Sequence, residues 1–204
     1  MKRIFVMAVL ALALPIAAFG SSVDFSNLGG TLSGTNAGLS LTGSMLASIN
    51  GLNGGGLVQG DLGSVTFSTG ALMKGGSLQN GGTFAAGGSF VITGNGTNGI
   101  PSGVIFNGTF SGPVTWTLQT GTDGTHYYTL AGTLNGTWLN TGMKVNGATI
   151  QLTINTGKGF FNGSTTISSG DTNINVAVPE PGTLGLLGTG LLGLAGAIHR
   201  KFKA

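Results

Sequence analysis

Apolar and polar residues alternate along much of the chain from residue 65 onward. The clearest runs are Val114 to Gln119 and Ile150 to Asn155, where every second residue is apolar. Shorter runs with the same period occupy residues 65–68, 90–92, 104–106 and 174–176. Because a period of two places successive side chains on opposite faces of a strand, these runs predict half-buried β-strands. No stretch of the body sustains the period of an amphipathic helix, and the nearest candidate, residues 39–52, is short and flanked by glycine.

Turn signals separate these runs. Asn-Gly, which suits turns that need positive φ, begins at positions 50, 53, 80, 95, 98, 107, 135, 146 and 162, and Asp-Gly begins at 123. The clearest hairpin joins residues 114–119 to residues 126–134 through residues 120–125. Many short strands with frequent turns predict an all-β fold, an antiparallel β-sandwich or jelly roll, with a β-solenoid as the alternative. Residues 24–60 are rich in Gly, Ser, Leu and Asn, and we expect edge strands or loops there.

Aromatic residues within or beside these runs are the expected core of the domain. Tyr127 and the two tryptophans would be able to stack on sugar rings if they were exposed, although alternation places the tryptophans in the core. The expected core aromatics are Phe106, Phe110, Trp116, Tyr128, Trp138, Phe160 and Phe161.

Composition narrows the classes of protein that the chain can be. Charged residues make up 6% of the chain, and there is no cysteine, so disulfides, thiolate metal sites and cysteine nucleophiles are excluded. Between residues 21 and 178 there are three lysines and four aspartates, and 3 − 4 gives a net charge of −1 although the whole chain carries +3. A nucleic-acid interface needs a basic patch, which this body does not offer, so we expect no nucleic-acid partner.

Both ends of the chain have the character of membrane-directed segments. Residues 1–20 are typical of a secretory signal peptide, because Lys2 and Arg3 precede an apolar run over residues 4–14. Small residues then predict a cleavage site for signal peptidase before residue 21. The residues of that site are Ala18, Gly20 and Ser21.

The last 27 residues combine three features. A Pro-Glu-Pro segment is followed by an uncharged Leu/Gly run over residues 183–198, which predicts a short transmembrane helix, and by a basic tail over residues 199–204. Basic residues after an apolar segment stop transfer and stay in the cytoplasm. The motif residues are Val178, Pro179, Glu180 and Pro181, and the stop-transfer residues are Arg200, Lys201 and Lys203.

This order of features resembles the PEP-CTERM sorting signal of exopolysaccharide-producing Gram-negative bacteria. The resemblance covers residues 178–203 alone, and it implies that an exosortase, a membrane enzyme, recognises Pro-Glu-Pro and cleaves near it. The prolines favour an extended conformation at the residues before them, and Glu180 is the only glutamate of the chain. We therefore expect three parts: a signal peptide (1–20), an exported β-domain (21–177) and a sorting signal (178–204).

The body offers little catalytic chemistry. It has no Glu, Arg or Cys, its only histidine is His126, and its four aspartates are isolated in the sequence. Asp123 and His126 fall at the expected hairpin turn, where Asp and Gly have conformational reasons to occur. We therefore expect no catalytic residue, no metal site and no cofactor.

The expected function is that of a non-enzymatic surface or extracellular-matrix protein. It would first be held in the inner membrane, in transient contact through its C-terminal helix, and would then reach the cell envelope, the cell surface or the extracellular matrix. The expected partners are the exosortase and exopolysaccharide. A carbohydrate-binding adhesin module and a permanently membrane-anchored envelope protein are the alternatives.

Overall fold

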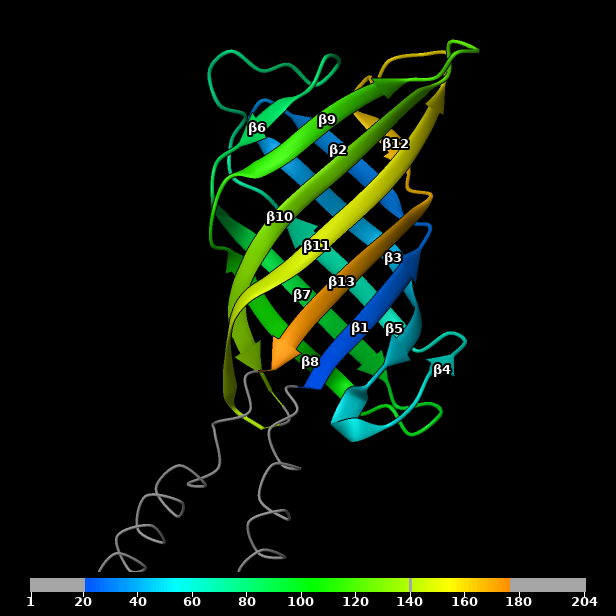
Figure 1. Cartoon of the computed structure of the whole chain (residues 1–204), viewed down its shortest axis with the longest axis vertical. Helices are drawn as coiled ribbons and strands as arrows, with labels where there is room; N and C mark the ends of the chain where they lie inside the picture. The colour runs from blue at the N-terminus through cyan, green and yellow to red at the C-terminus, as the bar shows by residue number, and fades with distance from the viewer. Residues whose placement is uncertain (1–20, 140, 177–204) are drawn as a thin grey trace, which may run out of the picture. The chain divides into compact units, whose positions relative to one another are not determined.

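The body of the protein is built from antiparallel strands that close into a ring. The computed structural model describes residues 21–139 and 141–176. Eight strands pair in the order β1, β13, β11, β10, β8, β7, β5 and β3, and β3 pairs in turn with β1, which closes a barrel (Figure 1). The elements are β1 (Ser21–Leu28), β2 (Thr31–Thr35), β3 (Gly38–Asn50), the 3₁₀ turn η2 (Leu52–Gly54), β4 (Val58–Gln59), β5 (Gly63–Ser68), β6 (Gly82–Phe84), β7 (Gly87–Asn95), β8 (Ser102–Phe110), β9 (Val114–Thr120), β10 (His126–Trp138), β11 (Met143–Gly157), β12 (Ser164–Thr166) and β13 (Ser169–Val176).

Three long strands, β3, β10 and β11, run through the barrel, and two of them, β3 and β10, each pair with two shorter strands placed end to end. One part of β3 pairs with β2 and the other with β1, and β10 is shared in the same way between β9 and β8. The break between β1 and β2 lies at Gly29-Gly30, and Gly30 has φ +84. A Cβ on Gly30 would lie 2.6 Å from the backbone nitrogen of Ser44, so only glycine fits this bend.

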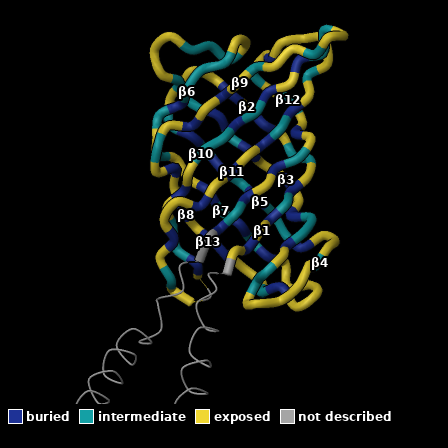
Figure 2. The backbone as a smooth tube through the Cα atoms, in the orientation of Figure 1, coloured by how far each residue is buried: buried dark blue, intermediate teal, exposed yellow. Residues whose placement is uncertain are grey.

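Alternation is preserved along β11 by a bulge. Ile150, Leu152 and Ile154 are buried, and the residues between them are exposed or half-buried. Figure 2 shows buried and more exposed positions alternating along the strands. Toward the start of the strand the register against β10 shifts beside Gly147, which has φ +76. The backbone N–H of Gly147 donates to Oδ1 of Asn135 at 3.0 Å. The extra residue lets Val145 point inward again, as a β-bulge does.

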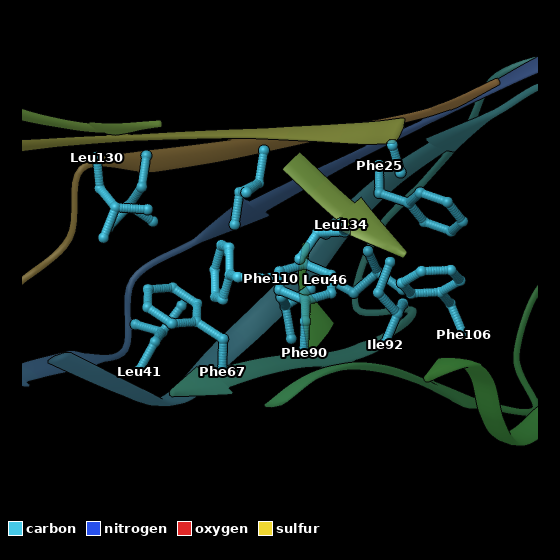
Figure 3. Packing of buried hydrophobic residues seen from close by; sticks show 14 of the residues in the cluster. Phe25, Leu41, Leu46, Phe67, Phe90, Ile92, Phe106, Phe110, Leu130 and Leu134 are labelled. Atoms are coloured by element: carbon cyan, nitrogen blue, oxygen red, sulfur yellow. The ribbon is translucent and has the colours of Figure 1, made fainter. Parts of the chain in front are cut away.

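The inside of the barrel is filled by apolar side chains (Figure 3). The ring centroids of Phe67 and Phe110 are 5.9 Å apart at 84°, and those of Phe90 and Phe106 are 6.2 Å apart at 63°. Edge-to-face pairs of this kind are favoured by the aromatic quadrupole. A second group packs Trp116 flat on Tyr128 with the edge of Phe161 against both rings.

Two identical tripeptides, Asn-Gly-Thr at 107–109 and at 135–137, lie side by side in β8 and β10. They pair antiparallel, so that Gly136 is opposite Gly108 and each Asn is opposite a Thr. A Cβ on Gly136 would lie 2.5 Å from Cζ of Phe106 and 2.8 Å from Cα of Gly108. The two glycines therefore make the room in which the Phe106 ring packs.

The closed barrel shows that the predicted sandwich or jelly roll was wrong, and the alternative solenoid is wrong as well. The strands and their alternation fit all of these architectures, because each buries one face of every strand. What distinguishes the barrel is the pairing of β1 with both β3 and β13, which leaves the ring of eight strands without a free edge.

Three local expectations were also wrong. Residues 24–60 form more than edge strands or loops, because β1 and β3 belong to the ring. The Asn-Gly pairs at 107, 135 and 146 lie within strands instead of turns, and Phe160, expected in the core, is 49% exposed. The other expected core aromatics are buried, and the hairpin of β9 and β10 is confirmed.

The first strand begins and the last strand ends at the same end of the barrel (Figure 1). The signal peptide (1–20), the sorting motif and the helix expected at 183–198 lie outside the described residues. No described residue belongs to a helix with the length and apolar character needed to span a bilayer.

Candidate functional site

The residues predicted for processing are almost all beyond the part of the chain that the structure describes. These are the signal peptidase residues Ala18 and Gly20, the motif residues Val178, Pro179, Glu180 and Pro181, and the basic residues Arg200, Lys201 and Lys203. Ser21, the residue after the expected cleavage, is the first residue of β1.

Asp123 and His126 bond to different partners and form no catalytic pair. The Asp123 carboxylate accepts the backbone N–H of Thr125 at 3.0 Å and the Thr125 hydroxyl at 2.8 Å. These two bonds hold the pKa of Asp123 below its ordinary value. His126 places Nδ1 3.2 Å from the carbonyl oxygen of Gly159 and stacks its ring on Phe160 at 4.2 Å. The Asp123 turn is therefore an Asx turn that shapes the β9–β10 loop.

The tryptophans do not offer a stacking surface for sugars. Trp116 is 1% exposed, and its indole N–H donates to the carbonyl oxygen of Leu78 at 2.8 Å. Trp138 is buried against Phe25, with ring centroids 5.8 Å apart. Tyr127, in contrast, faces outward from β10 and is 37% exposed.

An outer groove crosses the barrel over β10, β11, β13 and β1, and it is the leading candidate site. One depression of about 590 Å³ is lined by residues of these strands, and another of about 400 Å³ lies beside residues 73–76 and β6. Pro113, between β8 and β9, lines both depressions, so they adjoin there. The floor is low because Ala131 presents only a methyl group to the outer face.

Two cross-strand rows of outward residues run along this groove. The first row follows directly opposed pairs through five strands: Thr83, Thr115, Ala131, Gln151 and Asp171. The second row lies beside it and contains Thr133, Thr149 and Asn173. Except at Ala131, hydroxyl, amide and carboxylate groups therefore follow one another across the sheet at the spacing of neighbouring strands, about 4.8 Å.

Two aspartates stand where β13 meets β1 at one end of the groove. Oδ1 of Asp171 accepts the Ser26 hydroxyl at 2.7 Å, and Oδ1 of Asp24 accepts an amide N–H of Asn173. Each carboxylate has a second oxygen with further acceptor capacity. At the other end of the groove Lys74 lines the smaller depression. The groove thus offers hydrogen-bond acceptors at one end and a cation at the other.

Sequence reasoning missed this constellation. It treated the aspartates as isolated, and Asp24 and Asp171 are far apart along the chain. Only the pairing of β1 with β13 brings them together, and no local pattern signals that pairing. Among residues 21–139 and 141–176, no group of three or more His, Cys, Asp or Glu side chains is arranged to hold a metal ion.

Comparison with known proteins identifies the C-terminal segment. Residues 177–201 match the PEP-CTERM protein-sorting motif. This match confirms the resemblance on which the sorting signal was predicted and marks the chain as an exported protein that an exosortase sorts toward the cell envelope or surface. No curated protein and no solved structure was found to match the chain.

Proposed function

We propose that the chain is a non-enzymatic surface or extracellular-matrix protein whose barrel associates with exopolysaccharide after exosortase processing. The observation that carries the proposal is the pairing of a sorting motif at residues 177–201 with a barrel whose inside is apolar and whose outer groove is lined by hydroxyl, amide and carboxylate groups. Such groups exchange hydrogen bonds readily with a hydrated, hydroxyl-rich polymer.

A structural role is supported by what the reactive side chains do. His126, the only histidine between residues 21 and 177, is 9% exposed and lies under Phe160, where it is poorly placed to act as a base on a substrate. Asp123 is committed to its own turn through Thr125. The groove is lined with aspartate, threonine, asparagine and glutamine side chains, which can hydrogen-bond to a ligand without converting it chemically.

The sorting half of the proposal is tested by mass spectrometry of the mature C-terminus. In a host with an exosortase we expect residues 184–204 to be absent from the exported protein, and in a host without it we expect them to be retained. Glu180→Gln, which keeps the size of the side chain and removes its charge, should impair processing. Asp123→Asn, which removes a carboxylate from the β9–β10 turn, is the matched control and should be processed normally.

The association half is tested by fractionating the culture. We expect the processed protein to co-sediment with exopolysaccharide and to become freely soluble in a strain that makes no polymer. Retention of residues 184–204 and of membrane attachment in the presence of the exosortase would instead support a permanently anchored protein. Equal solubility with and without the polymer would contradict the association.

A further inference from the structure

We infer that the outer groove binds a neutral polysaccharide chain in an extended conformation, running across the strands from β6 toward β1. This inference rests on the proposed association with exopolysaccharide and assigns it to one face of the barrel. In Figure 1 the strands β10, β11, β13 and β1 lie side by side on the face toward the viewer, so the groove crosses a continuous surface.

The length of the groove indicates a polymer instead of a small molecule. The first row passes from Thr83 in β6 to Asp171 in β13, and the Ser26 hydroxyl on β1 then bonds to Asp171. A path across six neighbouring strands covers five interstrand spacings of about 4.8 Å, which is roughly 24 Å. The low floor at Ala131 leaves a chain free to lie close to the backbone of the sheet.

The hydrogen-bonding groups fit the hydroxyls of sugars. Asp24 and Asp171 each use Oδ1 for a bond within the protein, and the remaining oxygen of each carboxylate is an acceptor for a sugar O–H. Bonds to a charged acceptor are stronger than neutral ones. Gln151 and Thr149 stand beside them with both donor and acceptor capacity.

Charge favours a neutral chain over an anionic one. Asp24 and Asp171 lie within the same depression, and its lining contains no lysine, arginine or histidine. An acidic polysaccharide would place its carboxylates or sulfates against these two groups, and repulsion of like charges would weaken its binding. Lys74 borders only the smaller depression at the other end.

The test uses the exported protein and the extracellular polysaccharide of the same cells. The polysaccharide is first separated by anion exchange into a neutral and an anionic fraction. Affinity is measured by gel retardation with and without EDTA, which removes any bridging by divalent cations. We expect binding to the neutral fraction, weaker binding to the anionic one, and an affinity at least roughly tenfold lower for Asp171→Ala, since bonds to charged groups are of that strength. Ala131→Trp, which fills the groove from its floor, should abolish retardation.

Val91→Trp is the matched control, because Val91 also faces outward from a central strand, but on β7, between Thr66 of β5 and Asn107 of β8. It should bind as the wild type does. If Ala131→Trp does not fold, as judged by its circular dichroism, Gln151→Ala replaces it and should weaken binding severalfold.

The outcomes separate this inference from the proposal beneath it. If the wild type binds the polymer and neither groove variant binds it more weakly, the polymer binds elsewhere on the protein. That result would overturn the assignment to the groove and leave the proposed association with exopolysaccharide standing. Failure of the wild type to bind either fraction would overturn both. Preference for the anionic fraction, or binding that EDTA removes, would refute the assignment of a neutral chain held by direct hydrogen bonds.

Discussion

Gly136→Ala adds one methyl group to the inward face of β10, at the point where the two Asn-Gly-Thr tripeptides pair. The new Cβ would lie 2.5 Å from Cζ of Phe106, 2.5 Å from the carbonyl oxygen of Asn107 and 2.8 Å from Cα of Gly108. Two of these atoms belong to the backbone of the neighbouring strand and cannot rotate away. The methyl group therefore forces β8 and β10 apart, or displaces the Phe106 ring from the core.

The expected cost follows from these distances. Overpacking a well-filled core costs about 1–3 kcal/mol, and occasionally more. Because the obstacles include the backbone of a paired strand, we expect the upper end, about 3 kcal/mol. In a domain of this size about 1 kcal/mol shifts the melting temperature by roughly 2–4 °C, so the melting temperature should fall by roughly 6–12 °C.

Thermal denaturation of the exported protein, followed by circular dichroism, measures this effect. Gly112→Ala is the matched control, because its Cβ would meet only Oγ1 of Thr133 at the ordinary distance of 3.5 Å. Replacing a glycine without strain lowers the entropy of the unfolded chain, so this control should be neutral or slightly stabilising. A melting temperature for Gly136→Ala equal to that of Gly112→Ala would refute the packing of Phe106 over the paired glycines.

Two further predictions concern the opposite end of the barrel. Tyr128→Phe removes a hydroxyl that donates to the carbonyl oxygen of Gln79 at 2.6 Å and accepts the backbone N–H of Phe161 at 3.0 Å. It should lower the free energy of unfolding by about 1–3 kcal/mol, because a buried N–H loses its partner, and an unchanged denaturant midpoint would contradict this. Hydrogen bonds from Thr125 make the pKa of Asp123 lower in the folded protein than in the unfolded chain. The stability that this carboxylate contributes is therefore present above the pKa of the unfolded chain and is lost as the pH falls through the pKa of the folded protein. The stability difference between wild type and Asp123→Ala should therefore disappear in acid, and an NMR titration of Asp123 at the ordinary aspartate midpoint would rule the effect out.

Strands in the second half of the chain could be predicted because apolar and polar residues alternate within each of them. Alternation over residues 114–119 and 150–155 identifies β9 and part of β11, and the turn residues 121–125 join β9 to β10 as expected. In β3 the signal is masked by its glycines and by the register shift against β5 between Leu41 and Ser44. The sequence therefore predicted edge strands or loops for a stretch of thirteen residues that in fact pairs with four other strands.

Asn-Gly was the least reliable local signal. The same dipeptide forms a turn at residue 50 and lies inside strands at residues 107, 135 and 146. At Gly147 the reason is a bulge, whereas at Gly108 and Gly136 it is the space taken by the Phe106 ring. Local sequence does not distinguish a glycine needed for its backbone from one needed for its missing side chain.

The candidate groove was beyond sequence reasoning for a related reason. Its lining comes from strands that adjoin only in the closed ring, and the residues that meet at its acidic end, Ser26 and Asp171, are 145 positions apart. The sorting motif, in contrast, is a continuous segment of the chain at residues 177–201, so the sequence alone was enough to identify it.

The pairing of β1 with β13 also bears on the order of events during export. Closing a loop of this length is slow and entropically costly, so the barrel is expected to complete itself late in folding. Until β13 has emerged, β1 and β11 each have an unpaired edge and the aromatic core is open on one side. The last strand of the ring ends at Val176, and the match to the sorting motif begins at the next residue. The strand that closes the barrel is therefore followed at once in the chain by the segment that directs sorting.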